Sequence, residues 1–217
     1  TALLSQEVVG IPGKGEAAHF DADDAKANIP EYARGIAAGD AAAATSTHEE
    51  SSHMAKRGVR EALAAGYSVV HDGVGDDGVA NVAGKVAAFR AAAGRPIRVV
   101  ADYATIDPEV ALARANLRAA VSGRVIPPDV FNAKHADVNG TAWAAGQRDV
   151  FDAITVWDSD VPMGEPPIKV WSKARGEDVV VHDEALFAKF KQRAGVRGDA
   201  AAALTTARMY EILVRFA

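Results

Sequence analysis

The sequence predicts an α/β fold in which a parallel β-sheet is flanked by helices. The first observation is that helix-like and strand-like segments alternate along much of the chain, as in sheets whose strands are joined by crossover helices. The second is that polar residues follow the predicted strands, as expected at the ligand-binding edge of an open sheet; these are Asp21, Asp23, Asp72, Thr105 and Asp107. The third is size: 217 residues, 49% of them hydrophobic, are enough for one domain with a buried core.

The predicted elements follow one another in order. They are a helix over residues 1–9, a strand over 17–20, helices over 24–28 and 45–65, a strand over 67–71, a helix over 78–92, a strand over 97–103, and helices over 107–120 and about 128–138. Gly66 and Gly94 close two of these helices, as C-terminal glycines do, and Pro30 ends a third because the residue before proline avoids helical backbone. Asp107 is predicted to cap the helix that begins at Pro108.

The C-terminal part of the chain has a different pattern. Short strands over residues 153–157, 168–173 and 178–182 predict a meander, and helices over residues 183–194 and 199–216 follow it. We therefore expect a core over residues 1–138 and a C-terminal α+β extension over residues 139–217 that packs on the core.

Composition excludes several classes of protein. The net charge of −5, from 24 basic and 29 acidic residues, argues against nucleic-acid binding, which normally needs a basic surface. We expect neither a membrane span nor a signal peptide, because no apolar stretch has the required length and pattern. The absence of cysteine excludes disulfides and fits a reducing compartment. We expect a cytoplasmic protein with a small-molecule substrate.

Three arginines lie in and just after the helix over residues 107–120. Arg114 and Arg118 are four residues apart and share one helix face, and Arg124 follows the helix. A guanidinium presents a planar fork of donors with a permanent charge, which suits phosphate oxygens. A solvated helix face explains the same residues, so both interpretations stay open at this point.

Aspartates follow the first predicted strand. A carboxylate at such a position can accept a proton from a substrate hydroxyl, or it can cap the helix that follows. We predict that Asp24 is the cap and that Asp23 is a candidate general base, with capping as its alternative role.

The segment over residues 72–78, DGVGDDG, follows the next strand. It lacks the spacing of a calcium-binding loop, and we interpret it as a glycine-rich strand exit that lets the backbone approach a substrate. An ordinary turn between a strand and a helix is the alternative.

The chain has two nearby histidines, but their spacing is not that of a zinc-binding helix. His48 and His53 are five residues apart, so they point in different directions on a helix. We expect a helix start here instead, capped by Thr47 or Ser46.

The loop over residues 10–15, GIPGKG, is not predicted to bind phosphate. No Ser or Thr follows Lys14, and the loop follows a helix where a phosphate loop would follow a strand. The segment Thr1-Ala-Leu-Leu, however, is typical of the first helical turn after a phosphate loop. Thr1 is therefore a candidate magnesium-binding hydroxyl, with the glycines and lysine of the loop expected upstream of it.

Taken in order, these segments resemble the zeta toxin family, phosphate-loop (P-loop) kinases of bacterial toxin–antitoxin systems. The resemblance covers about residues 1–138. It rests on TALL (1–4), FDADDAKANIPEY (20–32), HEESS (48–52), GYSVVHDGVGD (66–76), DPEVALARANLR (107–118) and GRVIPPDVFNAKH (123–135). The resemblance implies a P-loop-kinase-like parallel sheet flanked by helices.

The resemblance also implies roles for the matching residues. Asp23 corresponds to the general base that acts on a sugar hydroxyl. Arg118 and Arg124 correspond to arginines that bind the nucleotide phosphates and stabilise the transferring group. Lys26 and Asp72 correspond to positions near the substrate.

Three further residues complete the implied site. Gly73 and Val74 belong to the substrate-binding segment, although Val74 stands where the family usually has threonine. Thr1 is implied in binding the nucleotide and Mg²⁺.

The implied reaction is transfer of the γ-phosphate of ATP or GTP, with Mg²⁺, to the 3′-hydroxyl of the amino sugar in UDP-N-acetylglucosamine. An antitoxin protein is the implied partner. A related small-molecule kinase acting on an antibiotic or a dinucleotide, and a non-catalytic domain that binds nucleotide or a partner protein, are alternatives. Activity requires the upstream loop, because positioning and charge neutralisation supply most of the catalysis in phosphoryl transfer.

Overall fold

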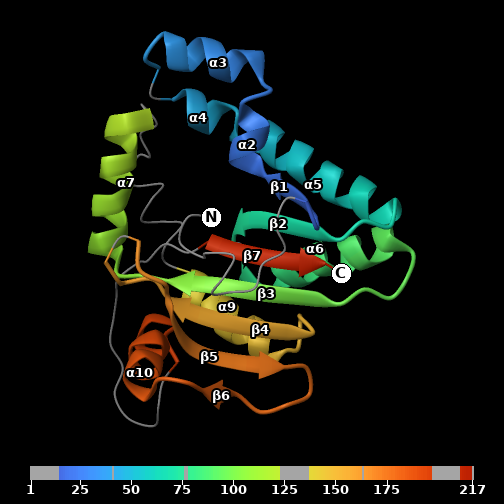
Figure 1. The fold of residues 1–217 in the computed structure, drawn as a ribbon, viewed down its shortest axis with the longest axis vertical. Coiled ribbons are helices and arrows are strands. Elements are labelled where there is room, and N and C mark those ends of the chain that lie inside the picture. Colours follow the sequence, from blue (N-terminus) through green and yellow to red (C-terminus); the bar gives the residue numbers. More distant parts are fainter. Residues whose placement is uncertain are drawn as a thin grey trace.

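The computed structural model describes residues 15–40, 42–75, 78–122, 137–162, 164–196 and 211–216. These residues form one seven-stranded sheet in the order β1-β2-β7-β3-β4-β5-β6, with helices packed against it (Figure 1). The predicted α/β class is confirmed.

The sheet is built around four strands that run in the same direction. The strands are β1 (Ala18–Asp21), β2 (Val69–Val74), β3 (Val99–Thr105), β4 (Ala153–Asp158), β5 (Ile168–Ala174), β6 (Val180–Val181) and β7 (Glu211–Phe216). β1 pairs with β2 in parallel, as does β3 with β4, and β7 lies between β2 and β3, antiparallel to both. β5 and β6 continue the sheet as an antiparallel meander, as predicted.

The helices lie between the strands in the chain order that the alternating pattern predicts. They are α2 (Ala22–Lys26), α3 (Pro30–Ala37), α4 (Ala43–Ser46), α5 (His48–Ala64), α6 (Gly78–Ala93), α7 (Pro108–Ser122), α9 (Val138–Gln147) and α10 (Glu184–Arg193). Gly66 and Gly94, which follow α5 and α6, have φ values of 90° and 62°, the left-handed conformation that glycine adopts at a helix end.

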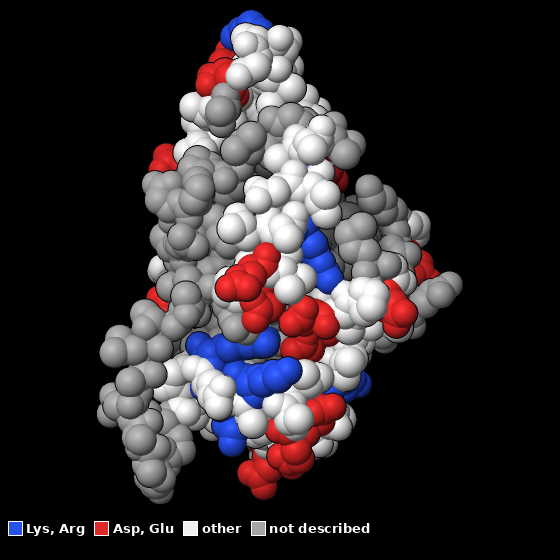
Figure 2. Space-filling view, turned by 90° about the vertical axis from the view of Figure 1, so that its left-hand side faces the viewer, with Lys and Arg blue, Asp and Glu red and all other residues white. Residues whose placement is uncertain are grey.

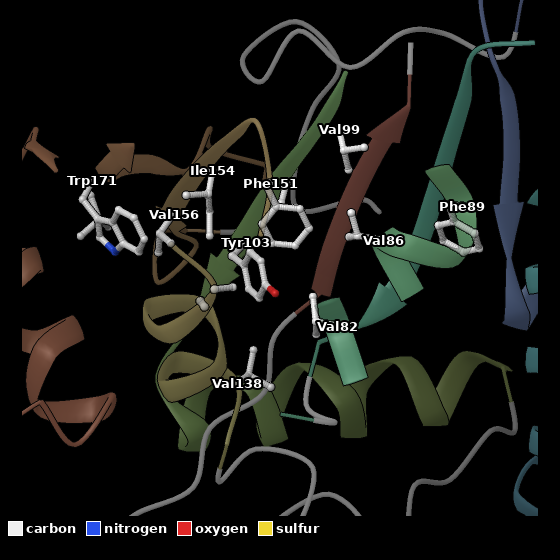
Figure 3. Packing of buried hydrophobic residues seen from close by; sticks show 14 of the residues in the cluster. Val82, Val86, Phe89, Val99, Tyr103, Val138, Phe151, Ile154, Val156 and Trp171 are labelled. Carbon is white, nitrogen blue, oxygen red and sulfur yellow. The ribbon is translucent and has the colours of Figure 1, made fainter. Parts of the chain in front are cut away.

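The main hydrophobic core lies between the sheet and helices α5, α6, α9 and α10. Figure 3 shows side chains from these layers meeting around Tyr103 of β3, with Val86 from α6, Val138 from α9 and Ile154 from β4. Alternate residues of β3 face this core, as the period of a strand requires. Burying a Val, Leu, Ile or Phe side chain in this core contributes about 1.5–3 kcal/mol, and this packing fixes the sheet and the ends of its strands.

Several predicted elements differ from the structure. The predicted helix over residues 199–216 is wrong over Glu211–Phe216, which form β7. Such a short apolar run fits a buried strand or a helix equally well by pattern, and here strand pairing on both sides decides it. The sheet is therefore mixed and not purely parallel. The helices α3 and α9 were not predicted, and the expected helix over residues 128–138 lies almost wholly outside the described residues.

The predicted long helix over residues 45–65 is divided at Thr47. Thr47 stands at the N-cap position of α5, but its side chain does not cap that helix. Its hydroxyl donates instead to the carbonyl oxygen of Ala43, at 2.8 Å, because α4 ends immediately before α5 begins.

His71 on β2 is a buried titratable residue of this core. Its ring makes an edge contact with Phe89 of α6, with the ring centroids 5.7 Å apart. Burial, together with the nearby charges of Lys85 and Lys56, lowers the pKa of His71 to about 4. Protonation of His71 therefore favours the unfolded chain.

We expect acid to destabilise the fold through His71. Its pKa is about 6.5 when unfolded and about 4 when folded. Above about pH 6.5 His71 is neutral in both states and does not lower the free energy of unfolding. As the pH falls from 6.5 towards 4, only the unfolded chain binds the proton, so the free energy of unfolding falls by up to about 3 kcal/mol in total. Urea unfolding of the wild type and of His71→Gln at several pH values measures this. The difference between the two proteins isolates His71 from the carboxylates, and equal pH slopes would contradict the expectation.

Candidate active site

The carboxyl ends of the parallel strands meet at one edge of the sheet. β1 ends at Asp21, β2 at Val74, β3 at Thr105 and β4 at Asp158. This edge, to which β3 points in Figure 1, is where open α/β sheets bind their ligands. Figure 2 views the molecule from this side and shows acidic and basic side chains gathered next to one another near the middle of the face.

The aspartates at the end of β1 and in α2 do not all have the roles that were predicted for them. Asp21 is the N-cap of α2, and its Oδ1 accepts a hydrogen bond from the backbone N–H of Asp23 at 2.7 Å. The prediction that Asp24 is the cap is wrong, because α2 begins at Ala22, directly at the strand end, and Asp24 lies within its first turn. Burial raises the pKa of Asp21, partly opposed by this hydrogen bond.

Asp23, the candidate base, pairs with Lys26 one turn along α2. The ammonium of Lys26 lies 3.0 Å from Oδ1 of Asp23. The Lys26 side chain is only 3% exposed, whereas that of Asp23 is 43% exposed. A buried cation therefore orients a carboxylate that solvent and ligands can reach.

The substrate segment predicted on β2 lies beside these aspartates. Asp72 is directly opposite Asp21 in the parallel register of β1 and β2, which places the two residues next to each other on the same face. Gly73 and Val74 are the last residues of β2 and pair with the antiparallel β7. The structure thus brings Asp72 to the edge that carries Asp23.

Arg114 anchors α7 to the loop after β4. Its guanidinium donates to the carbonyl oxygen of Ser159, at 2.8 Å, and to that of Val161. A purely solvated role is therefore wrong for this arginine. Arg118 lies one turn further along α7 and is exposed. The predicted cap of this helix is confirmed, because Oδ1 of Asp107 accepts from the N–H of Glu109 at 3.0 Å.

A buried polar network lies at the ends of β3 and β4, and the sequence did not predict it. Arg193, the last residue of α10, donates to Oγ1 of Thr105 at 2.9 Å and lies 3.5 Å from Oδ2 of Asp158. Ser159 donates its N–H and its hydroxyl to the carbonyl oxygen of Thr105, at 2.7 and 3.1 Å. Burial raises the pKa of Asp158, opposed by its hydrogen bond from the N–H of Asp160 and by the charge of Arg193.

A sequence signal for part of this network existed. Asp158, Ser159 and Asp160 follow a predicted strand, as Asp21 and Asp23 do. Arg193 had no such signal, since its partners are distant in the sequence.

Two predicted site residues lie beyond the part of the chain that the structure describes. Thr1 and Arg124 lie outside the described residues, so the magnesium-binding hydroxyl and the second phosphate-binding arginine stay predictions. Within the described residues, no group of three or more His, Cys, Asp or Glu side chains is arranged to hold a metal ion.

Comparison with protein families decides the class of this chain. The family model for zeta toxin matches residues 1–186, well over half of the 217 residues. The chain belongs to the zeta toxin family. The match extends past the predicted core and includes β4, β5, β6 and the start of α10. No curated protein and no solved structure matches the chain.

Membership of the zeta toxin family indicates a P-loop-kinase-like phosphotransferase of the toxin–antitoxin type. Kinases of this family generally use ATP and Mg²⁺. Among the helices that the structure describes, none combines the length and the apolar composition needed to cross a membrane.

Proposed function

We propose that this zeta toxin family member transfers the γ-phosphate of ATP or GTP to the 3′-hydroxyl of the amino sugar in UDP-N-acetylglucosamine. The observation that carries the proposal is the Asp23–Lys26 pair at the end of β1: a reachable carboxylate held by a buried ammonium. It lies at the same edge of the sheet as Asp72 and the start of α7, which carries Arg118. Within the zeta toxin family, an acid at this edge and an arginine on the helix that starts there support phosphoryl transfer to a hydroxyl.

In the proposed reaction Asp23 accepts the proton of the sugar hydroxyl. The hydroxyl oxygen then forms a bond to the γ-phosphorus, and the bond from that phosphorus to the bridging oxygen breaks, releasing the nucleoside diphosphate. Arg118 and Arg124 neutralise the charge that gathers on the transferring group, which together with positioning is the main task of a phosphotransferase.

Lys26 has a different role from the substrate contact that the family resemblance implied. Its ammonium is buried against Asp23, so we assign it to orienting the base. The neighbouring carboxylates of Asp21 and Asp72 are acceptors that suit a sugar with several hydroxyl groups. An anionic group would be repelled at this part of the edge, so we place the sugar there and the phosphates towards α7.

The donor set at this edge also fits Mg²⁺. Carboxylate and hydroxyl oxygens are its preferred ligands, and nucleotide-bound Mg²⁺ usually takes one or two protein ligands in addition to phosphate and water. We therefore propose Thr1, with a carboxylate at this edge, as the protein's contribution to a magnesium–nucleotide complex. The bound ion would offset charge on the phosphates.

The proposal is tested with the full chain, Mg²⁺ and ATP labelled on its γ-phosphate. We expect label to appear on UDP-N-acetylglucosamine and not on a matched analogue that lacks the 3′-hydroxyl. Transfer to both compounds would contradict the 3′ assignment. Transfer only to an antibiotic or a dinucleotide would favour a related small-molecule kinase, and nucleotide binding without any transfer would favour a non-catalytic domain. A partner antitoxin would be sought by testing whether it abolishes this transfer.

A further inference from the structure

We propose that Arg193, at the end of α10, is a positioning residue for phosphoryl transfer that sets the location of α7 and its Arg118. The inference rests on the proposed function. It assigns a role in the active site to a residue beyond the part of the chain that the family model matches.

Arg193 is held in place by the packing of α10. α10 begins at a capped end, where Oδ1 of Asp183 accepts from the N–H of Leu186 at 2.9 Å. Phe187 and Phe190 anchor the helix in the main core, where both contact Trp143 of α9. The side chain of Arg193, only 9% exposed, therefore starts from a rigid support.

Arg193 joins the ends of β3 and β4. One nitrogen of its guanidinium contacts Oγ1 of Thr105 on β3 and faces Oδ2 of Asp158 on β4. The side chain of Asp158 is 4% exposed, and its other oxygen accepts from the N–H of Asp160 at 2.7 Å. Without Arg193 a buried carboxylate would lose its cationic partner, and the segment around Asp158 would rearrange to reach water.

α7 rests on the segment that Arg193 stabilises. The N–H of Ser159 donates to the carbonyl oxygen of Thr105, and the carbonyl oxygen of Ser159 accepts from Arg114 of α7. Arg118 shares the face of Arg114 one turn further on. A shift of the loop would therefore move Arg118 relative to Asp23. A displacement of about 1 Å at a reacting centre can lower the rate by about 100-fold.

The test measures kcat and KM for Arg193→Gln, Arg193→Lys and a matched control, Arg90→Gln. Arg90 also pairs with an aspartate, Asp152, at 2.9 Å, but just before β4, at the opposite end of the strand. We expect Arg193→Gln to lower kcat by about 10- to 100-fold with little change in KM. Arg193→Lys should recover most of the lost kcat, because a single nitrogen makes both contacts. Arg90→Gln should keep the wild-type kcat. All assays are run below the melting temperature of the least stable variant.

A double-mutant cycle distinguishes positioning from general destabilisation. If Arg193 and Arg114 act through the same loop, the effects of Arg193→Gln and Arg114→Ala on kcat should be clearly less than additive. Additive effects, or a kcat for Arg193→Gln equal to that of the wild type, would overturn the inference and leave the proposed function intact.

Hydrogen exchange gives a readout that needs no catalysis. In the full chain, Arg193→Gln should speed amide exchange in the segment 159–162 and in α7, with α5 unchanged as the internal reference. Unchanged exchange in α7 would overturn the inference whatever the activity. If exchange in α7 is faster in Arg193→Gln but the wild-type protein transfers no phosphate, the link between Arg193 and α7 would be supported and the proposed function rejected.

Discussion

Replacing Arg118 by alanine should lower kcat for phosphotransfer by about 10³–10⁵-fold, the range known for an arginine that neutralises charge on a transferring phosphoryl group. The physical reason is that the charge on the γ-phosphate oxygens is redistributed as the bond to the leaving group breaks. A guanidinium aimed at those oxygens stabilises the transition state more than the ground state. Steady-state kinetics with saturating nucleotide and UDP-N-acetylglucosamine measure the change in kcat.

Four companion variants test whether the effect is specific to the guanidinium of Arg118. Arg118→Lys should recover little of the kcat lost in Arg118→Ala, because an ammonium cannot supply the planar fork of donors. Arg114→Ala should cause a smaller loss, because Arg114 donates to backbone carbonyls and acts by holding α7. Arg57→Ala removes an exposed arginine of α5 that pairs with Glu61, and should leave kcat unchanged. Equal losses for Arg118→Ala, Arg114→Ala and Arg124→Ala would indicate a general charge effect and contradict the specific role.

The second large effect is expected for Asp23→Asn. The amide keeps the shape of the side chain and an oxygen that can accept from Lys26, but it cannot take the proton of the substrate hydroxyl. We expect kcat to fall by about 10²–10⁴-fold, the usual span for loss of a general base. Nucleotide affinity, measured by fluorescence titration, should stay near that of the wild type.

Asp24→Asn is the matched control for this variant. Asp24 lies next to Asp23 on α2 and is also exposed, but it is neither the cap of α2 nor the partner of Lys26. Its replacement should leave kcat unchanged and cost at most a little stability. An Asp23→Asn protein that retains full activity would remove the assignment of the base.

Local chemistry made several elements predictable from the sequence. Gly66 and Gly94 mark helix ends because glycine adopts positive φ without a steric penalty, and both do so here. Asp107 and Pro108 mark the start of α7 because an aspartate can satisfy a free N–H while a proline lacks one. Such signals depend only on residues that are close in the sequence, so they do not depend on how the rest of the chain packs.

Elements whose state depends on pairing were not predictable in the same way. Glu211–Phe216 forms a strand because β2 and β3 offer hydrogen-bonding partners on both sides. Its six residues carry no periodicity strong enough to exclude a helix. The cap of α2 was misassigned by a related error, since the exact end of β1 moved the start of the helix to Ala22.

For the site, the sequence by itself determined the α/β class, the acidic ends of the strands and the arginine face of α7, and it carried the motifs of the zeta toxin family. Only the tertiary structure decided which of these groups meet. It buried Lys26 against Asp23, set Asp72 opposite Asp21, and brought Arg193 to Thr105 across 88 residues of sequence. The physical reason is that a hydrogen bond or ion pair requires an approach of about 3 Å. Over such a separation, that approach is set by how the sheet and helices pack.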